Sequence, residues 1–265
     1  MITLASDFGS PYPAAMKGVM LQRTDARLVD VAHDLPRQDV RAAAFWLREV
    51  LPYFPPATHL VVVDPGVGTD RAALVVRAGV YLLVGPDNGV LLPPARRLAE
   101  SDGSEIEIYE WSYENAASST FHGRDVFAPA AAEVHEAGLD GFADLDPVSP
   151  VDEYADLEFP EPEVREDGAT GEVLVVDDFG NVVTNIPGKV LVGPEGDVRD
   201  GREQIEVNGQ EVPVDRSYAH VPVGQWLATV GSHENVEFAV NQGRGDEAFG
   251  LAPGDEVELG WERGR

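Results

Sequence analysis

An aspartate and an arginine flank a glycine-rich turn in the first half of the chain. Asp64 follows the valine-rich residues 60–63, and Arg71 stands just before a second apolar run. Short apolar runs bounded by turn residues indicate strands buried on both faces, and ligands of open α/β sheets bind beyond the carboxyl ends of such strands. The pair is therefore a site candidate, with a surface ion pair over a turn as the competing interpretation.

Two further polar clusters stand at expected element boundaries. Asp7 follows a short apolar strand and precedes a Phe-Gly pair. His122 lies just before an alanine-rich segment that predicts a helix. An imidazole in that place can act as a general base or orient a water molecule, and the alternative is a helix-cap histidine bonded to the backbone. The spacing of the acids and histidines does not demand a metal ion, and we expect none.

Strands and helices alternate through the first part of the chain. The periodicity of apolar residues predicts strands over residues 2–5, 26–31, 60–63, 72–77, 80–84 and 106–109, and helices over residues 14–22, 40–50 and 126–135. Asp39 is the expected N-cap of the second helix. This alternation indicates an α/β domain with a mostly parallel sheet sandwiched by helices.

The composition changes after residue 143. Residues 144–169 are rich in acids and prolines, which indicates a linker. Alternating segments then predict strands over residues 171–176, 189–192, 204–207, 211–214, 227–231, 236–240 and 256–259, and Asn208-Gly209 is a hairpin-turn signal. We therefore expect an α/β domain over residues 1–143 and a small all-β antiparallel barrel over residues 170–265.

Charge is the unusual feature of the composition. The chain has 47 acidic and 19 basic residues, a formal net charge of −28 and a pI near 4.3. This balance argues against nucleic acid or an anionic membrane as a partner and is typical of a halophile protein, whose surface charges are screened by salt. The chain has no cysteine and no apolar run of about 20 residues, so we expect a cytoplasmic globular protein.

The clusters together resemble one protein family. Their order is that of the S-adenosyl-L-methionine (SAM) hydroxide adenosyltransferases, also called SAM hydrolases, which are related to the fluorinase and chlorinase enzymes. The motifs that carry the resemblance are Asp7-Phe8-Gly9, Lys17-Gly18, Val63-Asp64-Pro65-Gly66-Val67-Gly68-Thr69, Arg71, Gly85-Pro86-Asp87-Asn88-Gly89, Thr120-Phe121-His122-Gly123-Arg124-Asp125 and Phe179-Gly180-Asn181 with Thr184-Asn185-Ile186. They span nearly the whole chain.

The resemblance implies roles for individual residues. The family's water-activating trio matches Asp64, Arg71 and His122, and its ribose-binding acid matches Asp7. The segment over residues 232–241 resembles the family's adenine-wrapping segment. The other residues that we expect to bind substrate are Phe8, Gly123, Asp177, Phe179, Asn181, Ser232, Glu237 and Val240.

The resemblance also implies a reaction and an assembly. The reaction is SAM plus water to adenosine plus L-methionine, with SAM as substrate and no cofactor. The assembly is a homotrimer with active sites between subunits. A SAM-dependent halogenase and a non-catalytic SAM- or adenosine-binding protein are the alternatives. In the halogenating relatives a serine that holds the halide stands where this chain has Gly123, which favours water as the nucleophile.

One departure from the family pattern concerns methionine recognition. The family usually has two more residues between the Asp-Phe-Gly and Lys-Gly motifs, including an acid near the methionine ammonium. Here Ser10-Pro11-Tyr12 closes that gap without an acid. We therefore expect Asp177 to carry more of the recognition of methionine.

The net charge predicts that stability depends on salt. At 0.01 M salt the screening length is about 30 Å, and at 1 M it is about 3 Å, so self-repulsion should destabilise the folded chain at low salt. We expect a lower melting temperature in dilute than in molar potassium chloride, measured by circular dichroism. An uncharged osmolyte is the control because it leaves screening unchanged. Equal melting temperatures at both salt concentrations would contradict the halophile interpretation.

Overall fold

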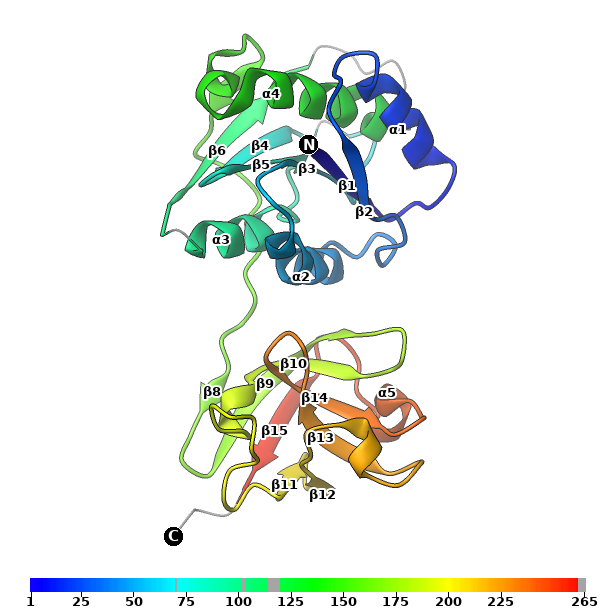
Figure 1. Cartoon of the computed structure of the whole chain (residues 1–265), viewed down its shortest axis with the longest axis vertical. Coiled ribbons are helices and arrows are strands. Elements are labelled where there is room, and N and C mark those ends of the chain that lie inside the picture. Colours follow the sequence, from blue (N-terminus) through cyan, green and yellow to red (C-terminus); the bar gives the residue numbers. More distant parts are fainter. Residues whose placement is uncertain (70, 102, 114–119, 262–265) are drawn as a thin grey trace. The chain divides into compact units, whose positions relative to one another are not determined.

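The computed structural model describes residues 1–265 except 70, 102, 114–119 and 262–265. Contacts divide the chain into two compact units, Met1–Glu158 and Phe159–Arg265. The first contains helices and a sheet, and the second consists mainly of strands (Figure 1). None of the helices in the described ranges has the length and apolarity that a membrane span requires.

The first unit is built on a seven-stranded sheet with the order β2-β1-β3-β5-β4-β6-β7. Its central strands are short, mostly apolar segments whose residues are almost all buried, as expected for a sheet covered by helices. The strands are β1 (Ile2–Ser6), β2 (Leu28–Ala32), β3 (Thr58–Val62), β4 (Ala73–Ala78), β5 (Tyr81–Pro86), β6 (Ile106–Trp111) and β7 (Val148–Pro150).

Helices cover both faces of this sheet. α1 (Tyr12–Met20) and α4 (Ala128–Gly141) lie on one face, and α2 (Val40–Val50) and α3 (Leu92–Glu100) lie on the other (Figure 1). The small residues of α4 pack closely against the strands and against Met16 and Met20. Asp39 caps α2 as expected, because its Oδ1 accepts a hydrogen bond from the Ala42 N–H at 2.9 Å.

The sheet is mixed, so the expectation of a mostly parallel sheet is only partly met. The pairs β1–β2, β1–β3 and β3–β5 are parallel, whereas β4–β5, β4–β6 and β6–β7 are antiparallel. Only Gly79 and Val80 separate β4 from β5, and Gly79 has a φ of +56°. A parallel pair needs a crossover of about a dozen residues, so a two-residue connection forces a hairpin.

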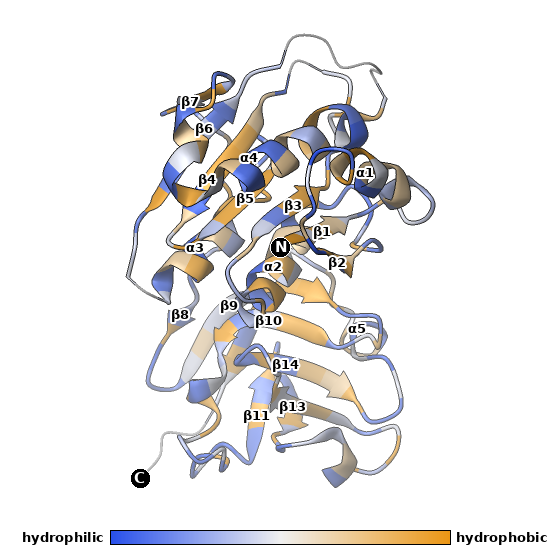
Figure 2. Ribbon diagram, turned by 45° about the horizontal axis from the view of Figure 1, so that its top comes forward, coloured by the Kyte–Doolittle hydropathy of each residue, from blue (hydrophilic) through white to orange (hydrophobic). Residues whose placement is uncertain are grey.

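The second unit forms a nearly closed antiparallel sheet. Its order is β12-β11-β15-β9-β10-β14-β13, β8 pairs with β9, and a bridge between Val214 and Ala228 joins the two ends. The strands are β8 (Glu163–Val164), β9 (Gly168–Val176), β10 (Val182–Pro187), β11 (Gln204–Val207), β12 (Gln210–Pro213), β13 (Trp226–Val230), β14 (Asn235–Val240) and β15 (Glu256–Gly260). Strands in both units are largely apolar, and the loops are largely polar (Figure 2).

Some elements differ from the expectations. The expected strand at residues 189–192 is wrong, because Gly188–Val190 forms a 3₁₀ turn. α3, the short helix α5 (Gly245–Phe249) and β10 were not predicted. The polar residues Thr184 and Asn185 in the middle of β10 look like a turn in sequence, although Thr184 is fully buried and its hydroxyl donates to the Val236 carbonyl. The Asn208-Gly209 hairpin turn is confirmed, with φ of +50° and +82°.

Candidate active site

Two adjacent strands bring the N-terminal acids to one edge of the sheet. β1 and β3 are parallel neighbours, and Ser6 pairs with Val62. Asp7 directly follows β1, and Asp64 lies two residues after the end of β3 (64 − 62). The two carboxylates are therefore close enough that the charge of Asp7 acts on Asp64.

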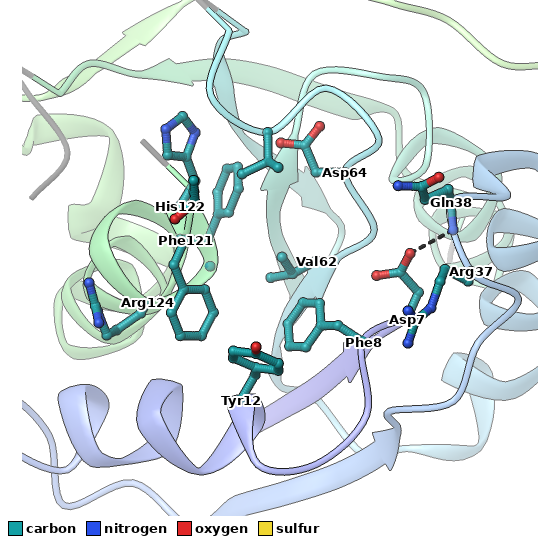
Figure 3. A pocket seen from close by; sticks show the side chains of 14 residues that line it. Asp7, Phe8, Tyr12, Arg37, Gln38, Val62, Asp64, Phe121, His122 and Arg124 are labelled. Carbon is teal, nitrogen blue, oxygen red and sulfur yellow. Dashed lines mark hydrogen bonds between the residues drawn. The ribbon is translucent and has the colours of Figure 1, made fainter. Parts of the chain in front are cut away.

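A cavity of about 470 Å³ opens at this edge. Its volume is in the range of small-molecule sites. The view in Figure 3 shows Asp64 between His122 on one side and Asp7 with Gln38 on the other. The cavity is lined by Asp7, Phe8, Tyr12, Arg37, Gln38, Val62, Asp64, Val67, Thr120, Phe121, His122, Gly123, Arg124 and Phe127.

Asp64 is a buried carboxylate with one occupied oxygen. Its side chain is 5% exposed, and its Oδ1 accepts from the Gly66 N–H at 3.0 Å and lies 3.3 Å from Arg71 Nε. Its Oδ2 is buried and has no hydrogen-bond partner among the described residues. Burial raises the pKa of Asp64, although Arg71 and the Gly66 N–H oppose this rise. The oxygen without a partner is therefore an available acceptor on a residue that lines the cavity.

Arg71 reaches Asp64 because the turn contains a glycine. A Cβ on Gly66 would lie 2.3 Å from Nη2 of Arg71, so the guanidinium occupies the space that any side chain there would fill. The described lining of the cavity includes Asp64 and His122 but not Arg71. Arg71 therefore acts on the cavity through its position against Asp64, and the turn is shaped to hold it there.

His122 enters the cavity from the chain segment before α4. It is 6% exposed, precedes a π-helical turn at Gly123–Phe127, and makes no capping hydrogen bond with its side chain. The ring of Tyr113 packs edge-on against it, with centroids 6.0 Å apart, and the Tyr113 hydroxyl donates to the Arg71 carbonyl at 3.0 Å. Tyr113, which the sequence analysis did not single out, thus contacts both the His122 ring and the backbone of Arg71.

Asp7 lies beside an aromatic wall. It is 9% exposed, and its Oδ2 accepts from the Gln38 N–H at 2.7 Å. The rings of Phe8, Tyr12 and Phe121 pack edge-to-face, with centroids 5.5–6.1 Å apart. Apolar rings beside a buried carboxylate suit a ligand that has a flat apolar part and hydroxyl groups. Sequence reasoning missed Tyr12 and Gln38, because one contributes packing and the other a backbone N–H.

The expected methionine-binding residues of the second unit form a tight turn. Asp177 Oδ1 accepts from the N–H groups of Phe179 and Asn181, and its Oδ2 accepts from the Asn181 amide at 2.9 Å. Gly180 has a φ of +86°, which closes the turn. Phe179 is 79% exposed, an unusual degree for a phenylalanine.

A second cluster in this unit centres on Glu237, which is 4% exposed. The Tyr218 hydroxyl donates to Oε1, and His233 Nε2 lies 3.3 Å from Oε2. Burial and the neighbouring carboxylates of Glu237 and Asp177 raise the pKa of Tyr218, so the phenol stays protonated and donates. Ser232 is exposed in the turn before β14, and Val240 ends that strand.

The described residues contain no group of three or more His, Cys, Asp or Glu side chains that could hold a metal ion. Asp87 accepts from the Ala155 N–H, and Asp125 pairs with Arg124 at 2.6 Å. These acids therefore have local partners in the fold.

The raised pKa of Asp64 predicts a pH-dependent cost to stability. The ordinary value is 3.8. Because the folded-state pKa is higher, the carboxyl favours folding only below its ordinary value, and this contribution is lost as the pH rises through the folded-state pKa. Asp64→Asn does not ionise, so it should gain stability relative to the wild type as the pH rises from about 3.5 to 7. Urea unfolding at constant salt measures this difference.

Asp30→Asn is the matched control in the same unit. Burial opposes but does not outweigh hydrogen bonds from Lys17 and His33, which together hold the pKa of Asp30 below its ordinary value. This variant should therefore lose stability relative to the wild type over the same pH range. Identical trends for the two variants would contradict the electrostatic account of Asp64.

Comparisons with known proteins agree on one family. A model described as the SAM hydroxide adenosyltransferase N-terminal domain matches residues 2–142, and one described as the C-terminal domain matches residues 171–258. The chain is 43% identical to a protein of Thermus thermophilus and 38% identical to one of Salinispora tropica, each covering 96–97% of this chain and 97% of the relative. Both relatives are named (R)-S-adenosyl-L-methionine hydrolase.

Solved structures extend the similarity to the fold. An uncharacterized conserved protein from Thermotoga maritima matches with a TM-score of 0.76 and 32% identity, covering 98% of this chain and 99% of that one. A conserved hypothetical protein from Thermus thermophilus matches with a TM-score of 0.74 and 36% identity over the same shares. Both domain models and the full-length relatives agree with the resemblance carried by the motifs, and this chain belongs to the SAM hydroxide adenosyltransferase family.

Proposed function

We propose that this protein hydrolyses S-adenosyl-L-methionine to adenosine and L-methionine. The observation that carries the proposal is Asp64, which lines a ligand-sized cavity together with His122 and whose buried Oδ2 has no hydrogen-bond partner among the described residues. The names of the full-length relatives support SAM as the substrate and favour its (R)-sulfonium epimer.

The reaction breaks the bond between C5′ and the sulfonium sulfur. A water oxygen forms the new bond to C5′, the electron pair of the broken bond goes to sulfur, and one water proton passes to a base on the protein and from there to solvent. Bulk water has a pKa of about 15.7, so the attacking water needs a proton acceptor. Asp64 is the acceptor that we assign, because burial has raised its pKa above that of an ordinary carboxyl and made it a stronger base.

Arg71 and His122 complete the proposed catalytic trio. Arg71 supplies a fixed positive charge beside Asp64. It lowers the basicity of that carboxylate, and its proposed benefit is to the negative charge that develops on the water oxygen as the proton is removed. His122 borders the cavity, and its ring can orient the water or pass the proton on. Arg71 is held against Gly66, and His122 is packed against Tyr113. Such fixed positions favour preorganised catalysis.

The substrate-binding roles follow the family pattern. We assign the ribose hydroxyls to Asp7 and the contacts near the reacting carbon to Phe8 and Gly123. In the second unit we assign the methionine end to Asp177, Phe179 and Asn181, and the adenine to the segment that contains Ser232, Glu237 and Val240. The exposed ring of Phe179 and the local networks of Asp177 and Glu237 support binding roles for both segments.

We also propose a homotrimer whose active sites lie between subunits, in the cytoplasm. The family resemblance supports this assembly, and the exposure of Tyr12 at 53% and Phe179 at 79% gives each unit an aromatic surface near its proposed binding residues. Exposed aromatic side chains are frequent at protein interfaces.

Water rather than halide is the proposed nucleophile. A Cβ on Gly123 would lie 3.2 Å from the Met16 sulfur and 3.3 Å from Phe121 and Val62, so a halide-holding side chain has little room there. A chloride 4 Å from ionised Asp64 would also be opposed by about 4 kcal/mol at an effective dielectric of about 20. Water meets neither obstacle.

Product analysis in labelled water tests the proposed function. In molar potassium chloride and ¹⁸O-water, we expect adenosine that carries ¹⁸O at C5′, with methionine in equal amount. Mass spectrometry identifies both products. When SAM is supplied as a mixture of its two sulfonium epimers, only the (R) epimer should be consumed. Chlorinated nucleoside as the main product would support a halogenase, and binding without turnover would support a non-catalytic protein.

A pair of substitutions tests Arg71. Arg71→Ala should lower kcat by roughly 10²–10³, by analogy with the loss of one transition-state donor. Gly66→Ala should lower kcat in the same direction but less, because the new Cβ displaces the flexible guanidinium and leaves the backbone unstrained. The double variant should be no slower than Arg71→Ala, since both changes remove one interaction.

Arg77→Ala is the control for these substitutions. Arg77 forms an ion pair with Glu107 on the same sheet, 3.5 Å apart and half-exposed, and has no proposed catalytic role. It should leave kcat unchanged. Additive losses in the double variant would show that Gly66→Ala acts independently of Arg71. Full activity of Arg71→Ala would remove Arg71 from the mechanism.

A further inference from the structure

A chain of hydrogen bonds ends at Ser6, the residue before Asp7, which we assigned to the substrate ribose. Lys17 Nζ on α1 lies 2.6 Å from Asp30 Oδ2 on β2, Asp30 Oδ1 lies 3.0 Å from His33 Nε2, and His33 Nδ1 lies 2.7 Å from the Ser6 hydroxyl at the end of β1. Three elements thus meet through His33. None of these four residues lines the cavity as described.

The chain has a defined direction when His33 is neutral. The carboxylate of Asp30 only accepts hydrogen bonds, and its pKa is held low by Lys17 and His33 against the effect of burial, so Nε2 must carry the hydrogen. Nδ1 then accepts, and the Ser6 hydroxyl donates. Serine, histidine and aspartate in this order resemble a nucleophilic triad, but Ser6 is 0% exposed and no substrate can reach it. The arrangement is therefore a support.

What the chain supports is the contact between two loops at the cavity. The Gly9 N–H donates to the His33 carbonyl at 2.8 Å, and the Leu35 N–H donates to the Ser6 carbonyl at 3.3 Å. Beyond these bonds the Gln38 N–H donates to Asp7 Oδ2 at 2.7 Å, the contact drawn as a dashed line in Figure 3. The bond from Ser6 to His33 joins two side chains outside the cavity lining, so a substitution can remove it without changing Asp7.

We propose that His33 is a positioning residue that holds Asp7 and the Gln38 backbone in the geometry that binds the substrate ribose. The proposal rests on the hydrolysis of SAM proposed above. In this proposal the Nδ1 atom of His33, which contacts Ser6 next to Asp7, accounts for the effect on substrate binding. The Nε2 atom anchors the ring to β2 and α1 through Asp30 and Lys17. A side chain that keeps only one of these bonds separates the two roles.

Two variants of His33 and one of Ser6 test this assignment. His33→Asn places an amide near the Nδ1 position and keeps the Ser6 bond, whereas His33→Gln reaches the Nε2 position and keeps the Asp30 bond. Ser6→Ala removes the hydroxyl with little change in buried volume. We expect KM for SAM and the Kd for adenosine to rise about five- to tenfold in His33→Gln and Ser6→Ala, with kcat within twofold of wild type. His33→Asn should stay within twofold in all three quantities.

His135→Asn is the matched control. His135 is another partly buried histidine of the same unit, and it joins Thr58 at the start of β3 to the N-terminal ammonium, each at 3.1 Å. This variant should lower the melting temperature and leave KM and adenosine affinity unchanged. It separates loss of stability from loss of positioning.

Each result decides one proposal. Suppose that the wild type hydrolyses SAM. The positioning role is then wrong if His33→Gln and Ser6→Ala keep the wild-type KM and adenosine affinity, and also if they lower only kcat, in proportion to the fall in melting temperature. It is also wrong if His33→Asn and His33→Gln raise KM equally. If wild type fails to hydrolyse SAM, the proposed function is wrong, and calorimetry with adenosine still tests whether His33 and Ser6 position Asp7.

Discussion

Burying the carboxylate of Asp64 at the end of a central strand is the constraint on which the site depends. Desolvation penalises the charged form, and among the described residues Arg71, the Gly66 N–H and His122 act against it. The fold therefore has to supply these partners at fixed positions. Asn88 contributes from the neighbouring strand end, because its amide donates to the Val63 carbonyl at 2.8 Å and holds the backbone next to Asp64. A looser turn would let water in and remove the burial that raises the pKa of Asp64.

The same electrostatics suit a cationic substrate with neutral products. Asp7 raises the pKa of Asp64, so the two carboxylates repel each other in the free site. A sulfonium relieves that repulsion, and adenosine does not, which favours release of product over its retention. If the sulfonium charge fully neutralised both carboxylates, the site would stabilise the bound substrate in its ground state and slow the reaction. Arg71 limits this effect, because it already pairs with Asp64 at 3.3 Å before any ligand arrives.

The sequence predicted the parts of the site that depend on strand ends and turn residues. Asp7, Asp64 and His122 stand at such boundaries, and the structure places them around one cavity. The mixed sheet was missed although its signal was present, since two residues between expected strands exclude a parallel crossover. Gln38 and Tyr113 were not predictable in the same way. Gln38 acts through its backbone N–H, and Tyr113 acts through contacts that only the folded chain brings together.

An acidic surface and a charged active site place opposite demands on salt, and burial reconciles them. With a net charge of −28, exposed acids repel one another unless counterions screen them, to about 3 Å at 1 M. Asp64 has 5% of its side chain exposed and lies in direct contact with Arg71, so there is no space for ions between the two charges. Screening therefore acts on the surface and leaves this pair nearly unchanged. The proposed transfer of a proton to a buried carboxylate is therefore compatible with salt concentrations that screen the acidic surface.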